Sequence, residues 1–147
     1  MSKPLAFWDA SALVPLCVRE MSSRQAHIYI GKFSPVVWWA SLVEVHSAIC
    51  RLHRSRELSD QQKQGALSGL RLLARGWREV LPDDSIRELA AASLDKYRLR
   101  ASDSLQLAAA LAWCQMRPAK RTFVCADQRL AQAAGAAGFS VLQLLAA

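Results

Sequence analysis

Residues 5–13 read Leu5-Ala6-Phe7-Trp8-Asp9-Ala10-Ser11-Ala12-Leu13, four apolar residues that run directly into a carboxylate. A short apolar run of this kind is typical of a strand buried on both faces, as in a parallel sheet. Asp9 then stands at the carboxyl end of that strand, the edge at which open α/β sheets bind ligands. A plainer interpretation is that Asp9 only caps the helix that begins near Ser11. The stretch predicts a parallel sheet and leaves both roles of Asp9 open.

Strand-like apolar runs alternate with helical runs along the rest of the chain. The expected strands are residues 5–8, 35–39, 79–81, 122–125 and 140–142, and the expected helices are residues 11–18, 22–30, 41–56, 59–76, 83–97, 107–114 and 128–137. This alternation predicts a three-layer α/β/α fold with a central parallel sheet of four to five strands and right-handed crossovers. At 147 residues the chain fits a single domain, residues 1–147.

Local signals predict several helix ends. Gly31 follows the second helix and is expected to end it. Ser41 and Glu44 have the spacing of a capping box. Asp103 can cap in the same way, with Gln106 as its reciprocal partner. Each of these polar residues therefore has a purely structural explanation.

Charge and cysteine usage limit the functional classes. Lys and Arg number 19 against 12 Asp and Glu, so the formal charge of +7 favours a polyanionic partner, nucleic acid first and an acidic protein second. The four cysteines form no Cys-x-x-Cys pair, and we interpret them as reduced, buried packing residues of a cytoplasmic protein. No signal peptide is recognisable, and the most apolar run, residues 107–114, is too short to span a bilayer.

Three more acids accompany Asp9 at predicted helix starts. Glu44 and Asp127 follow strands directly, so the parallel topology brings them to the same sheet edge as Asp9. Asp103 follows a helix, and only a buried helix aimed at that edge can bring it there. Clustered carboxylates repel one another unless a cation lies among them, and their hard oxygens suit Mg²⁺ or Mn²⁺. A metal held in this way activates water and stabilises a phosphoryl transition state.

Four segments resemble those of PIN-domain nucleases, most closely the VapC toxins of bacterial toxin–antitoxin pairs. They are residues 7–13 around Asp9, residues 41–45 with Glu44, residues 99–110 around Asp103, and residues 123–130 around Asp127. The resemblance covers nearly the whole chain in the right order, and the middle two segments are the most specific. Pro15 and Ser102 depart from the usual pattern, but neither is one of the acids.

The resemblance implies a Mg²⁺- or Mn²⁺-dependent endoribonuclease that is held inactive by a cognate antitoxin. It assigns Asp9, Glu44, Asp103 and Asp127 as the catalytic and metal-binding acids, and Ser11 as the support of the metal's water. It also favours a homodimer, as does the number of apolar helices for one small sheet. Two alternatives remain. One is a non-catalytic nucleic-acid-binding or regulatory domain, and the other is a phosphatase with an Asp nucleophile, which lacks its usual second acid and its lysine.

Basic residues near the acids are candidates for contacts with RNA. Arg51 and Arg54 share a helical stripe with Glu44, while Arg98 and Arg100 precede Asp103. These arginines are expected to bind phosphate, although an ordinary solvated face explains them equally well. His46 and His53 are expected to be structural, and Trp39 is expected to pack in the core rather than to stack on a base.

Overall fold

A computed structural model describes residues 2–145 of the chain. Its centre is a five-stranded, fully parallel sheet in the order β3-β2-β1-β4-β5. The strands are β1 (Leu5–Trp8), β2 (Ser34–Trp38), β3 (Arg78–Val80), β4 (Thr122–Cys125) and β5 (Ser140–Gln143). The opening stretch of the chain therefore supplies the central strand, and the predicted α/β/α fold with a parallel sheet is confirmed.

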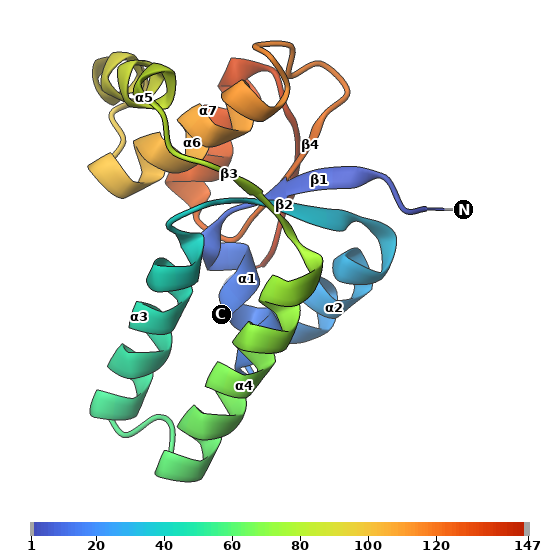
Figure 1. Ribbon diagram of the computed structural model, residues 1–147, viewed down its shortest axis with the longest axis vertical. Helices are drawn as coiled ribbons and strands as arrows, with labels where there is room; N and C mark the ends of the chain where they lie inside the picture. The colour runs from blue at the N-terminus through green and yellow to red at the C-terminus, as the bar shows by residue number, and fades with distance from the viewer. Residues whose placement is uncertain (1, 146–147) are drawn as a thin grey trace.

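Seven helices among the described residues cover the two faces of this sheet (Figure 1). One face carries α1 (Ala10–Cys17), α2 (Ser23–Lys32), α3 (Ser41–Arg54) and α4 (Asp60–Gly76). The other face carries α5 (Asp84–Tyr97), α6 (Ala101–Trp113) and α7 (Gln128–Ala137). The layers agree with a chain in which a helix follows each of the first four strands.

The core divides into two clusters because strand side chains alternate between the faces of the sheet. Phe7 and Phe123 pack against the α5, α6 and α7 layer, with ring centroids 5.2 Å apart. Trp8 and Val124 pack against the α1 to α4 layer. All four side chains are fully buried, as expected for strands covered on both faces.

Two predicted boundaries are wrong. Gly31 does not end α2, because the helix continues to Lys32 and the amide of Phe33 still donates to the carbonyl of Tyr29. The sixth helix begins at Ala101 instead of residue 107, so Asp103 lies inside its first turn. The apolar run of residues 107–114 forms only the second half of this helix, whereas the expectation that Asp103 lies in a first helical turn is confirmed.

The side chains predicted to be buried divide into two groups. Cys114 and Cys125 are buried, whereas Cys17 and Cys50 are half-buried, and all four thiols are free. Trp39 is 52% exposed, so the prediction that it packs in the core is wrong.

Along residues 2–145, no helix combines the length and apolarity required to cross a membrane.

Candidate active site

The site lies where the winding of the sheet reverses, between the neighbouring strands β1 and β4. Asp9 follows β1 and caps α1, which packs on one face of the sheet. Asp127 follows β4 and caps α7, which packs on the opposite face. The two chain segments diverge at this point and leave a crevice outside the strand ends, the usual ligand position in open α/β sheets. Both aspartates are therefore caps and also lie at the crevice.

Ser11 connects the two turns that form the crevice. Its hydroxyl donates to the carboxylate of Asp9 at 2.8 Å and accepts from the backbone amides of Ala126 at 2.9 Å and Asp127 at 3.1 Å. A hydroxyl has one hydrogen and two lone pairs, so all of its capacity is used. The predicted role of Ser11 beside a metal-bound water requires one of these bonds to be exchanged.

Asp9 is the most deeply buried of the four acids. Its side chain is 3% exposed and accepts hydrogen bonds from the amides of Ser11 and Ala12 as well as from the Ser11 hydroxyl. Burial, assisted by the negative charge of Asp103, raises its pKa to about 7 against the opposing effect of these hydrogen bonds. Near neutral pH this carboxylate is thus poised between its protonated and ionised forms.

Glu44 does not belong to a capping box, which corrects the prediction. The N-cap of α3 is Ala40, and Ser41 makes no capping bond. Instead, the amide nitrogen of Gln106 on α6 donates to Ser41 Oγ at 2.9 Å and to Glu44 Oε1 at 3.2 Å. Gln106 is 1% exposed, and its own Oε1 has no partner. A buried amide from the opposite layer therefore holds Glu44, whose pKa burial raises despite the Gln106 bond.

Asp103 reaches the crevice because the chain reverses between α5 and α6. Arg98 is the C-cap of α5 in the left-handed conformation (φ 54°), and Arg100 is the N-cap of α6. Asp103 is half-buried and caps nothing, so the predicted cap with Gln106 is wrong. Burial raises the pKa of Asp103, as does the charge of Asp127, while Arg100 and Arg129 oppose the rise. The described structure gives its carboxylate no hydrogen bond.

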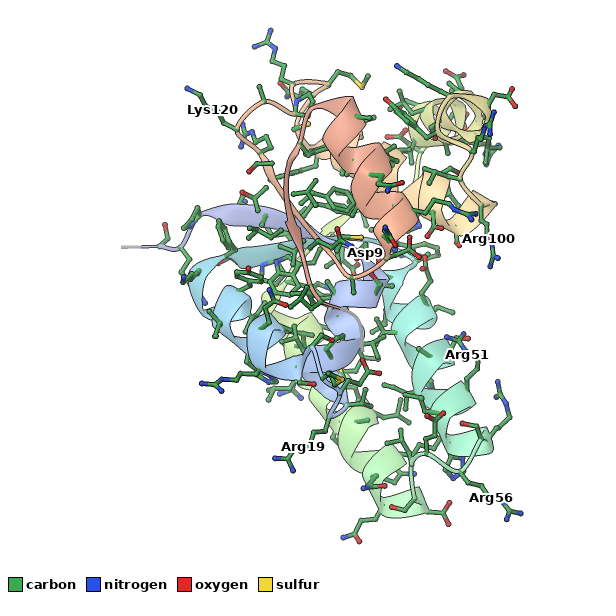
Figure 2. All side chains as sticks on the ribbon, turned by 180° about the vertical axis from the view of Figure 1, so that it is seen from behind. Asp9, Arg19, Arg51, Arg56, Arg100 and Lys120 are labelled. Atoms are coloured by element: carbon green, nitrogen blue, oxygen red, sulfur yellow. The ribbon has the colours of Figure 1, made fainter. Side chains whose placement is uncertain are left out.

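One cavity of about 460 Å³ unites the predicted acids. Its lining includes Asp9, Ser11, Glu44, Asp103 and Asp127, together with Arg51 and Ser102. Four carboxylates from both helical layers thus line one space, and in Figure 2 Asp9 lies nearer the middle of the molecule than Arg51 and Arg100. This concentration of hard oxygen donors suits a divalent cation in kind. Within residues 2–145, however, no three acid, histidine or cysteine side chains are close enough to hold a metal as they stand.

The other predicted residues differ in their relation to this cavity. Arg54 lines a neighbouring cavity formed by α1, α3 and the segments that follow these two helices. The side chain of Arg98 is exposed and borders neither space. His53 bonds Asp60 at 2.6 Å, which agrees with a structural role. Arg129 was not predicted as a site residue, although its position two residues after Asp127 places it at the same edge.

Comparison with known proteins gives a match in structure only. No family model and no curated protein matches the chain in sequence. A chain of a toxin–antitoxin complex from Klebsiella pneumoniae is 16% identical, with a TM-score of 0.61 over 97% of this chain and 99% of that one. A chain of FitAB bound to an IR36 DNA fragment is 13% identical, with a TM-score of 0.63 over 95% and 94%. The chain has a PIN-like fold. A chain of FitAcB from Neisseria gonorrhoeae has a similar fold, with 14% identity and a TM-score of 0.61 over 95% of this chain and 97% of that one.

The PIN-like fold explains why the acids meet. Its parallel order places the starts of α1, α3 and α7 at one edge, while the reversal before α6 adds a fourth helix start from the opposite layer. Each of these starts carries one acid. The fold thereby brings four acids that are far apart in the sequence to the lining of one cavity.

Proposed function

We propose that this chain is a Mg²⁺- or Mn²⁺-dependent endoribonuclease and the toxin of a toxin–antitoxin pair. The observation that carries the proposal is the convergence of Asp9, Glu44, Asp103 and Asp127 on one cavity at the crevice of a PIN-like fold. Two matched structures, a toxin–antitoxin complex and FitAB bound to a DNA fragment, support this class of function. The formal charge of +7 supports a nucleic-acid substrate.

The four acids are the proposed metal ligands. Their carboxylate oxygens are of the type that Mg²⁺ and Mn²⁺ prefer, although the side chains lie too far apart in the described structure to hold one ion together. A divalent ion supplies Lewis-acid activation of water and neutralises charge during phosphodiester hydrolysis. Asp103 is the most available ligand, because it accepts no hydrogen bond among the described residues. The hydrogen bond from Gln106 orients the carboxylate of Glu44 toward the cavity. The hydrogen bonds of Ser11 hold the turns of Asp9 and Asp127 together. Arg51 lies at the mouth, where it binds a substrate phosphate.

A cognate antitoxin and a second copy of the chain are the proposed partners. A small antitoxin that inserts an Arg or Lys side chain into the acid cavity replaces the charge of the metal and blocks RNA at once. For the homodimer, exposed apolar side chains gather at the ends of β2 and β3, where the Trp39 amide bonds the Val80 carbonyl. They are Trp39, Leu42, Val43 and Leu81. An apolar surface of this kind favours two-fold pairing.

The two alternatives fit the site less well. An Asp-nucleophile phosphatase needs an accessible carboxylate, and Asp9 is 3% exposed with both oxygens bonded. A non-catalytic nucleic-acid-binding domain gains support from the raised pKa of Asp9 and from the separation of the acids. Cleavage decides between this alternative and the nuclease.

The direct test is incubation of the purified protein with structured and unstructured RNAs, with and without Mn²⁺. The nuclease proposal predicts metal-dependent fragments from at least one RNA. Binding without any cleavage over the whole panel, by protein that is free of antitoxin, supports the non-catalytic alternative instead. Light scattering at tens of micromolar protein tests the dimer separately.

A further inference from the structure

A second polar cavity, of about 480 Å³, adjoins the acid cavity on the side of α6 and α7. It is lined by Arg100, Asp103, Asp127, Gln128, Arg129 and Gln132. Asp103 and Asp127 border both cavities, so the two spaces meet at this pair of acids. The new cavity thus continues the site past the acids, away from Arg51.

Helix electrostatics do not explain the two arginines of this cavity. Arg100 is the N-cap of α6, and Arg129 is the second residue of α7. Both lie at the positive end of a helix dipole, where a cation is unfavourable by a few tenths of a kcal/mol up to about 1 kcal/mol. Neither guanidinium comes within 4.0 Å of a carboxylate along the described chain, and both side chains are exposed. Neither arginine is thus held in an ion pair, although both are near enough to Asp103 to lower its pKa, and both face a cavity that also presents two glutamine amides.

We propose that Arg100 and Arg129 form an arginine clasp that binds a backbone phosphate of the RNA substrate beside the scissile bond. The clasp rests on the proposed nuclease function and defines the path of its substrate. Guanidinium groups match phosphate oxygens in bidentate geometry, and the amides of Gln128 and Gln132 add neutral donors.

The positions of the arginines indicate the direction of that path. Arg51 lines the acid cavity from α3, and the arginine clasp lines the adjoining cavity from α6 and α7. Figure 2 shows Arg51 and Arg100 on the same side of the molecule, with Asp9 nearer its middle. A strand that crosses from Arg51 to the arginine clasp passes directly over Asp103 and Asp127. This continuity favours a nucleic-acid strand, because its phosphates repeat along one chain.

The experiment measures binding and cleavage separately on the same variants. Binding of a fluorescein-labelled single-stranded RNA of mixed sequence is measured by anisotropy in EDTA over a series of salt concentrations. The variants are Arg100→Gln, Arg129→Gln and both together. Arg24→Gln is the control, since it removes the same charge from exposed α2. Thermal melting checks that each variant is folded, and Mn²⁺-dependent cleavage is followed in parallel.

The arginine clasp predicts that each single variant weakens binding about three- to tenfold near 0.1 M salt and lowers the salt slope by about 0.7. Arg24→Gln is expected to change affinity by less than about twofold. Equal affinities for Arg129→Gln and Arg24→Gln overturn the clasp, as does absence of RNA binding by the wild type. Arginine-dependent binding by a wild type that cleaves no RNA supports the clasp while the nuclease proposal fails.

Discussion

Two helices of this protein begin with the same local pattern but use it differently. At the start of α4, Ser59 and Gln62 form a true capping box, with Gln62 N to Ser59 Oγ at 3.1 Å and Ser59 N to Gln62 Oε1 at 2.8 Å. At the start of α3, Ser41 and Glu44 have the same spacing and form no such bonds. Both side chains instead accept hydrogen bonds from Gln106.

The difference follows from where the two helix starts lie. Ser59 is exposed, so its local hydrogen bonds have no competitor except water. Ser41 is fully buried against α6, and its hydroxyl meets the donor of another helix. A cap contributes about 1 kcal/mol, whereas a buried amide without partners costs about 1–3 kcal/mol. The tertiary bond to Gln106 therefore takes precedence over the local cap.

Two aspartate caps show the same contrast in their titration. Asp83 caps α5 on the surface, and hydrogen bonds from Ser85 and from the Ile86 amide lower its pKa. Asp9 caps α1 inside the protein, and burial raises its pKa to about 7. The same capping geometry thus shifts the pKa in opposite directions at the two sites. Desolvation, which raises the pKa, exceeds the lowering effect of the capping hydrogen bonds only in the interior.

The largest expected effect is that of Asp103→Asn. Asp103 caps nothing, so the variant should fold normally, and its metal-free stability should be equal to or above that of the wild type because one repelling charge is gone. Loss of residues that only orient a metal ligand costs 10- to 100-fold, so loss of a ligand should reduce Mn²⁺-dependent RNA cleavage by at least about 100-fold. Melting temperature and cleavage are measured on one preparation. Wild-type cleavage by a folded variant would remove Asp103 from the site.

The next effect concerns the pH dependence of stability without metal. Asp9 has a pKa of about 7 when folded and 3.8 as its ordinary value. Between these values the folded state holds a proton that the unfolded state releases, so the free energy of unfolding falls as pH rises. The fall from this group amounts to about 4 kcal/mol and levels off above pH 7.

Urea unfolding in EDTA from pH 4 to 8 measures this fall for the wild type and for Asp9→Asn. Glu44 and Asp103 also have raised pKa values and contribute in the same direction. Asp9→Asn should therefore flatten the profile strongly while leaving a smaller slope. Asp83→Asn, the exposed cap, should leave the slope between pH 4 and 8 unchanged. An identical slope in the wild type and Asp9→Asn contradicts the burial argument.

A smaller effect is expected from Gln106→Leu, which removes the hydrogen bonds that Gln106 donates to Ser41 and Glu44 at the start of α3. Loss of the amide releases Glu44, so we expect Mn²⁺ affinity to fall about tenfold or more, and metal-induced stabilisation to shrink. The free energy of unfolding without metal should fall by about 1–3 kcal/mol, because the fully buried Ser41 hydroxyl loses its donor, even though the unpartnered Oε1 of Gln106 is removed as well.

The readout is the rise in melting temperature at millimolar Mn²⁺, with Gln106→Glu as a second variant that keeps the size of the side chain. Gln106→Glu should be worse still, since it places a like charge beside Glu44. A full metal-induced rise in Gln106→Leu means that Glu44 is positioned without Gln106.

The smallest effect is expected for Gln62→Ala, which breaks the local bond in the comparison. Removal of one half of an exposed capping box should lower the free energy of unfolding by about 0.5–1 kcal/mol. Mn²⁺ stabilisation and RNA cleavage should stay at wild-type levels, because Gln62 lines neither the acid cavity nor the cavity that adjoins it. Chemical denaturation measures the first quantity. A change in cleavage contradicts the separation of local and tertiary roles.

The sequence by itself determined the layers of the fold and the edge at which the acids stand. The apolar run before Asp9, the alternation of strands and helices, and the capping of α4 by Ser59 depend on neighbours within a few residues. Such features are readable because hydrophobic periodicity and helix caps are local. The same locality placed Glu44 and Asp127 at that edge, since each directly follows a strand.

Only the tertiary structure decided how those residues are used. It brought Asp103 in on α6 through the left-handed turn at Arg98, paired Gln106 with Glu44, and left Trp39 exposed. None of these outcomes is visible in residue spacing, because each depends on which helix faces which across the sheet. Burial and the partner available there outweighed the local capping patterns of α3 and α6, since an unpaired buried polar group costs more than a lost cap.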